Sequence, residues 1–177
     1  MRIISLIPAA TEIISSLGLM GKLVGVSHEC DFPKEVFRLP KLTKSNIKQT
    51  QNSYDIHKDI EKILSAGLSV YEVDTELLKT LKPNIIITQT QCNVCAVGLD
   101  DIKSCLNSWL TTEITLIDLK SFSFNGIMNE ILEIGKNLNK INRARKVVKE
   151  INQEISYIKG KLNNEKKKNV LCIEWLN

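Results

Sequence analysis

The chain has 177 residues, of which 43% are hydrophobic and 25% charged, and its formal net charge is +4. These values are ordinary for a globular protein with a single core. The apolar runs are too short to cross a membrane, and no basic stripe interleaved with aromatic residues points to nucleic-acid binding. The first residues lead into a short apolar run with no cleavage-like segment behind it, so the sequence as written predicts a cytoplasmic protein with reduced cysteines.

The first third of the chain predicts two strands, a helix and a loop. A strand is predicted over 2–7, and Pro8 then opens a helix that Gly18 ends. A second strand is predicted over 22–27. The polar stretch 31–52 is predicted to be a loop with little regular structure.

The middle of the chain continues this alternation of short β-branched runs and amphipathic segments. The predicted elements are helices over 53–66, 75–81 and 98–110, and strands over 84–88 and 114–119. Asp74 is placed to cap the helix over 75–81. Short β-branched runs bounded by helices are typical of buried parallel strands. The fold class predicted for residues 1–122 is therefore an α/β lobe, a small parallel sheet flanked by helices.

The segment 125–162 contains no proline, and its apolar residues recur at helical spacing. We predict one long helix over 123–164, although the apolar pattern loses one residue of phase between Leu138 and Ala144. Such a helix spans roughly 55 Å, which exceeds the diameter of a small domain. Its second half therefore needs something else to pack against, and a coiled-coil dimer is the alternative.

The last apolar run, 170–176, predicts another strand. A single strand is not stable alone, so residues 165–177 are predicted to be the first strand of an incomplete second lobe. The long helix then connects the two lobes.

Reactive side chains follow two of the predicted strands at the point where each strand ends. They are His28, Glu29, Cys30 and Asp31 after the second strand, and Gln91, Cys92 and Cys95 after the third. Ligands bind beyond the carboxyl ends of strands in open parallel sheets, so both clusters predict one shared site. His28, Cys30, Cys92 and Cys95 could ligate a transition metal; contact with an organic ligand and simple packing are the alternatives, and a redox pair is a weaker one.

Two further positions are candidates for ligand contact. Pro8, Thr11 and Glu12 mark a helix N-terminus at a strand end, where free N–H groups suit an anionic or carbonyl group, or where Thr11 and Glu12 are plain caps. Glu174 and Trp175 leave the last strand, and the indole could lie against a flat macrocycle. The alternative is a core tryptophan.

The sequence resembles the substrate-binding proteins of the iron-chelate and vitamin B12 ABC transporters. Residues 2–12, 23–31 and 81–89 carry the resemblance, and the His-Glu-Cys-Asp and Cys-x-x-Cys motifs are similar to the cobalamin-binding-protein-like branch. The resemblance implies a periplasmic-binding-protein-like fold of two lobes joined by one long helix. It also implies that the family is usually exported.

The function implied is non-enzymatic binding of a corrinoid or iron chelate in an inter-lobe cleft, as part of an ABC importer that acts with a permease. No cofactor is required, and no nucleophile–base–orienter set predicts catalysis. The alternatives are a cytosolic metal-binding or thiol-redox protein that uses Cys92, Cys95, His28 and Cys30, or an inactive fragment.

Overall fold

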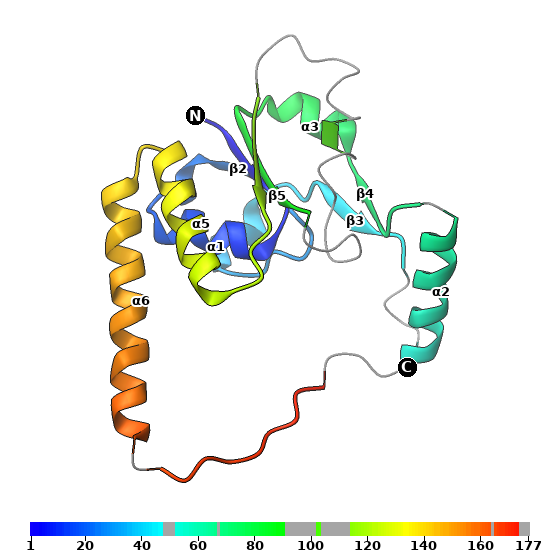
Figure 1. The fold of residues 1–177 in the computed structure, drawn as a ribbon. Coiled ribbons are helices and arrows are strands. Elements are labelled where there is room, and N and C mark those ends of the chain that lie inside the picture. Colours follow the sequence, from blue (N-terminus) through cyan, green and yellow to red (C-terminus); the bar gives the residue numbers. More distant parts are fainter. Residues whose placement is uncertain (48–51, 67, 91–101, 104–113, 164, 174–177) are drawn as a thin grey trace.

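A computed structural model describes residues 1–47, 52–66, 68–90, 102–103, 114–163 and 165–173 (Figure 1). Its centre is a four-stranded sheet in the order β2-β1-β5-β6, and every pairing in it is parallel. The strands are β1 Ile3–Ser5, β2 Leu23–Val26, β5 Ile85–Gln89 and β6 Thr115–Leu119. The α/β class and the four strands predicted from the sequence are confirmed.

The helices also follow the predicted pattern closely. They are α1 Pro8–Ser16, α2 Ser53–Ser65, α3 Thr75–Leu81, α5 Phe124–Asn137 and α6 Ile141–Leu162. Short 3₁₀ turns lie at Met20–Lys22 and Lys34–Arg38. Asp74 caps α3 as predicted, because its Oδ1 accepts a hydrogen bond from the Leu77 N–H at 2.9 Å. The helix predicted over 98–110 lies mostly outside the described residues.

The sheet is buried on both faces, as continuous β-branched runs require. Alternate residues of a strand point to opposite faces. Ile3 therefore packs with residues of α1, α5 and α6, whereas its neighbour Ile4 packs with Leu42, Leu78 and Ile102 on the other face. Both isoleucines are fully buried.

The stretch 31–52 is more regular than the predicted loop. It contains β3 Thr43–Ser45, which pairs antiparallel with β4 Tyr71–Val73. A bridge from Val26 to Lys41 places the segment before β3 beside β2. Three-residue strands are too short to show an alternating pattern, which is why the sequence did not indicate them.

The single helix predicted over 123–164 is wrong, because the structure has two helices there. α5 and α6 form an antiparallel hairpin with a turn at 138–140, where Asn139 has a left-handed φ of 55° (Figure 1). The turn coincides with the loss of phase in the apolar pattern. Gly135 lets the helices meet closely, since a Cβ at that position would collide with the Cβ of Ala144.

The second half of α6 extends past the sheet. α6 has 22 residues and α5 has 14, so the eight extra residues reach about 12 Å beyond the start of α5. α5 begins directly after β6, at the carboxyl ends of the strands. The extension of α6 therefore lies at the carboxyl edge of the sheet (Figure 1). Val148 and Ile151 still pack against the core, whereas Ile158 and Leu162 are 46% and 56% exposed.

The strand predicted over 165–177 is not formed within residues 165–173. Val170, Leu171 and Ile173 are exposed there, and none of the strands among the described residues pairs with this segment. Glu174 and Trp175 lie outside the described residues. The division into a lobe, a connecting helix and a second lobe therefore stays a prediction. Within the described part, no helix is both long and apolar enough to cross a bilayer.

Candidate functional site

The carboxyl edge of the sheet brings two of the predicted clusters together. α1 begins directly after β1, and the loop from His28 to Asp31 follows β2, the neighbouring strand. The side chains of Thr11 and Cys30 meet, with 3.2 Å between Oγ1 and Sγ. Gln91, Cys92 and Cys95 lie outside the described residues, so their part in this site stays a prediction.

Thr11 connects α1 to β1 through a buried hydrogen bond at this edge. It is fully buried and donates a hydrogen bond to the Ser5 hydroxyl at 2.8 Å, which in turn donates to the Ile7 carbonyl at 2.9 Å. No side chain caps the start of α1, so Thr11 and Glu12 do not have the capping role considered as an alternative. Pro8 is half-buried and Glu12 is exposed, which leaves these two accessible to a ligand.

Cys30 is poorly suited to bind a metal or exchange electrons. Its side chain is 1% exposed, and burial raises the pKa of the thiol, against the smaller effects of the Thr11 hydrogen bond and the Lys41 charge. Burial and a raised pKa both disfavour the exposed thiolate that acts as a nucleophile or an electron donor. Within the described residues Cys30 lies in the hydrophobic core, and its part in a ligand or metal site stays a prediction.

The strand order also sets how far apart the two halves of the predicted metal site are. β1 lies between β2 and β5, so the ends of β2 and β5 are about 9.6 Å apart, two strand spacings. A set shared by His28, Cys30, Cys92 and Cys95 must bridge that gap, which the sequence alone does not indicate. Within the described residues, no three His, Cys, Asp or Glu side chains are placed to hold a metal.

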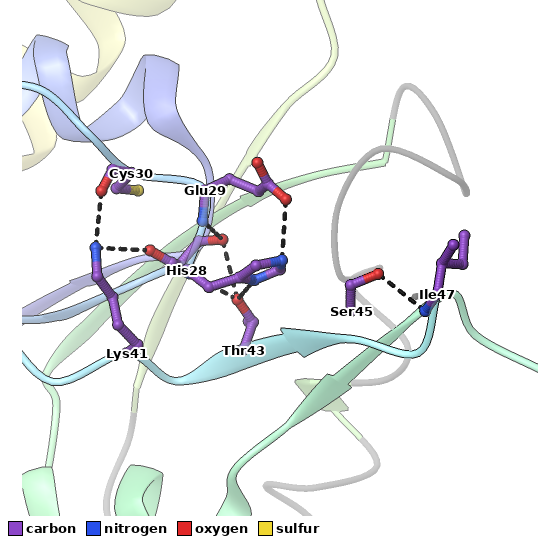
Figure 2. A network of polar contacts seen from close by, with 8 residues as sticks. His28, Glu29, Cys30, Lys41, Thr43, Ser45 and Ile47 are labelled. Carbon is purple, nitrogen blue, oxygen red and sulfur yellow. Dashed lines mark hydrogen bonds and ion pairs between the residues drawn. The ribbon is translucent and has the colours of Figure 1, made fainter. Parts of the chain in front are cut away.

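His28 is held by a polar network around Thr43 (Figure 2). The Thr43 hydroxyl accepts a hydrogen bond from the His28 backbone N–H at 3.0 Å, and lies 2.7 Å from His28 Nδ1 and 3.0 Å from the Ser27 hydroxyl. On the other side of the ring, Nε2 lies 2.9 Å from the Glu29 carboxylate but makes no well-directed hydrogen bond. The imidazole is therefore fixed in place, with one polar atom incompletely satisfied.

Lys41 and Tyr71 complete the surroundings of this loop. The Lys41 ammonium donates to the Cys30 carbonyl at 2.7 Å (Figure 2), and the Tyr71 ring lies 5.4 Å from the imidazole, centroid to centroid. An open polar hollow of about 370 Å³, lined by residues 41–44 and 72–75, adjoins the network. The sequence does not indicate the roles of Ser27, Lys41, Thr43 and Tyr71. Thr43 reaches His28 because the segment before β3 lies beside β2, and Tyr71 reaches it because β4 pairs with β3.

The Thr43 hydroxyl should contribute measurably to stability. Replacing Thr43, which is 5% exposed, by valine keeps the shape but leaves the His28 N–H without its acceptor. We expect Thr43→Val to lower the free energy of unfolding by about 1–3 kcal/mol, the cost of an unsatisfied buried polar group. Thr43→Ser keeps the hydroxyl and should lose less than about 1 kcal/mol, for one methyl group. Urea unfolding of both variants measures the difference, and equal midpoints would contradict it.

Comparison with known proteins gives relatives of one kind. No family model matches the chain. YvrC of Bacillus subtilis, an ABC transporter substrate-binding lipoprotein, is 26% identical over 167 residues, which cover 94% of this chain and 41% of that protein. A vitamin B12-binding protein of Vibrio vulnificus is 31% identical over 115 residues, 58% of this chain and 42% of that protein. The chain thus spans less than half the length of these relatives.

Solved structures share the fold over about half of their length. A possible iron-binding, periplasmic solute-binding protein of Staphylococcus epidermidis matches 94% of this chain and 53% of its own, with a TM-score of 0.67 and 22% identity. The periplasmic heme-binding protein HutB of Vibrio cholerae matches 91% of this chain and 50% of its own, with a TM-score of 0.62 and 22% identity. At this level of identity the likeness establishes the fold.

The predicted cytoplasmic location is wrong. The relative from Bacillus subtilis is a lipoprotein, and the heme-binding protein of Vibrio cholerae is periplasmic. The prediction relied on the first residues of the chain, which form β1, an inner strand of the sheet. The apolar residues of a buried strand are explained by the core of the sheet, so they do not indicate whether the protein is exported.

Proposed function

We propose that this chain, which belongs to the substrate-binding family of the iron-chelate and vitamin B12 ABC transporters, binds one face of a corrinoid or iron-chelate ligand without catalysing a reaction. The family predicted from the sequence is the one that the relatives represent. The observation that carries the proposal is the carboxyl edge of the sheet. The α1 start, the His28 loop and the extension of α6 all lie at this edge.

The chemistry of this edge suits binding better than catalysis. His28 is held by Thr43 and faces Glu29, and the Cys30 thiol is buried with a raised pKa. These side chains form a rigid polar wall, and Pro8 and Glu12 remain accessible beside it. Rigid walls with a few placed polar groups are typical of small-molecule sites. The cytosolic thiol-redox or metal-binding alternative is not favoured, because the relatives are named as transport and ligand-binding proteins.

The ligand class comes from the relatives. Their names include binding of vitamin B12, heme and iron. Corrinoids and hemes share a flat tetrapyrrole-type ring with apolar faces and polar edges. In our proposal the chain contributes one wall of the site, the part of the relatives' length that it does not span contributes the other, and an ABC importer permease receives the ligand.

Titration of the purified chain tests the proposal. We expect calorimetry to detect weak, saturable binding of cyanocobalamin, hemin or a ferric siderophore, and no binding of adenosine nucleotides as an unrelated control. Far-UV circular dichroism confirms that the protein used is folded. A folded chain that binds none of the three ligand classes at millimolar concentration would refute the proposed function.

A further inference from the structure

Phe122 presents an aromatic ring to solvent at the same edge of the sheet, directly after β6 and far from the His28 loop. It lies in the short connection between β6 and α5, and its side chain is 82% exposed. Leaving a phenylalanine side chain in water forfeits the favourable free energy that its burial would supply. A single exposed aromatic residue needs no explanation by itself, so its surroundings decide whether it has a role.

The backbone on the N-terminal side of Phe122 is held in place. The Glu130 carboxylate accepts hydrogen bonds from the backbone N–H groups of Lys120 at 2.7 Å and Ser121 at 2.9 Å. One oxygen atom, Oε1, accepts both. Glu130 belongs to α5, so the connection is tied to the helix that follows it.

The backbone on the C-terminal side is held as well. The Ser123 hydroxyl caps α5 by accepting a hydrogen bond from the Gly126 N–H at 3.1 Å. Gly126 also packs tightly against Ser121, since a Cβ at Gly126 would lie 2.8 Å from the Ser121 hydroxyl oxygen. Because the backbone is fixed on both sides of Phe122, its exposed ring is already positioned before a ligand binds. Positioning of this kind lowers the entropy cost of binding.

We infer that Phe122 stacks against the flat apolar face of a tetrapyrrole-type ligand, an inference that rests on the proposed function. β6 and β2 are the two outer strands of the sheet, so their ends are about 14 Å apart, three strand spacings. Phe122 and the His28 loop thus lie at opposite ends of the carboxyl edge of the sheet. An aromatic ring on one side and a polar wall on the other match a ligand with an apolar face and polar edges.

Substitution of Phe122 tests this inference with cyanocobalamin and hemin as probes. We expect Phe122→Ala to weaken binding of the preferred probe about threefold to tenfold, the range that aromatic stacking supplies. Phe122→Tyr should bind like the unmodified chain, because it keeps the ring. Tyr54→Ala is the matched control, since Tyr54 is 64% exposed on α2, with the Lys58 ammonium 4.7 Å from the centre of its ring, and α2 is not part of the proposed site. It should leave the affinity unchanged.

The outcomes separate this inference from the proposed function. If the unmodified chain binds a probe and Phe122→Ala binds it equally well, the stacking role is overturned while the proposed function stands. If the unmodified chain binds neither probe nor a siderophore, both are overturned. Thermal unfolding of each variant shows whether the fold is intact, and an 82% exposed side chain should leave the midpoint nearly unchanged.

Discussion

A chain extended by a complete second lobe should bind cobalamin at least about 100-fold more tightly than the 177-residue chain. Binding sites bury most of a ligand's surface, whereas a single lobe can cover only one face. A 100-fold gain corresponds to about 2.7 kcal/mol. Burial of about 110 Å² of additional apolar surface supplies that much. Calorimetry on both proteins measures the ratio of their dissociation constants.

A chimaera with the second half of the vitamin B12-binding relative supplies the extended protein. The second half alone is the control, because it shows whether affinity comes from that half by itself. We expect weak binding by each half and strong binding by the chimaera. Equal affinities for the 177-residue chain and the chimaera would exclude a ligand site that lies between two lobes.

Gly135→Leu should be among the most destabilising single substitutions in the helical hairpin. The position has no room for a Cβ, because Ala144 of α6 occupies the space. A leucine there must push α5 and α6 apart, and overpacking of this kind costs about 1–3 kcal/mol or more. The gain in helix propensity over glycine offsets less than about 1 kcal/mol. Urea unfolding followed by circular dichroism measures the net loss.

Gly160→Leu is the matched control for this substitution. Gly160 is also helical, but apart from its chain neighbours and the backbone of its own helix no described atom lies within 4 Å of a Cβ built there. The same exchange should therefore raise stability by a few tenths of a kcal/mol through helix propensity. Adding Ala144→Gly to Gly135→Leu should recover part of the loss. If both glycine variants unfold at the same urea concentration, the close helix contact does not contribute to stability.

The sequence predicted elements correctly where the local pattern of residue types agreed with the environment of those residues in the fold. The run Ile85–Gln89 is β-branched and lies between two helical patterns, and it forms the buried strand β5. Asp74 and Pro8 indicated helix starts, and both start helices in the structure. These signals, together with the matching segments of the family, were enough for the α/β class and the parallel sheet.

The pairing of distant segments was not accessible in the same way. Nothing in the residues around Thr43 indicates that β4 will pair with β3 across 25 intervening residues. Nor does the sequence of β2 reveal that β1, and not β5, is its neighbour. The helix break at 138–140 left a visible loss of phase, but a change in phase does not distinguish a bend from a reversal of direction. Sheet order and chain reversal depend on packing between elements, which single-sequence periodicity does not report.

The segment between β3 and β4 has a consequence for how this lobe can vary. Ser45 and Tyr71 are paired, so the segment leaves and re-enters the lobe at adjacent points. None of the side chains of α2, the helix within it, is buried. Each doubling of a loop's length changes its closure entropy by only about 0.6 kcal/mol. Insertions and deletions here thus alter the outline of the molecule at little cost to the sheet, which makes this segment a place where proteins of the same architecture can diverge in length and surface while the core stays the same.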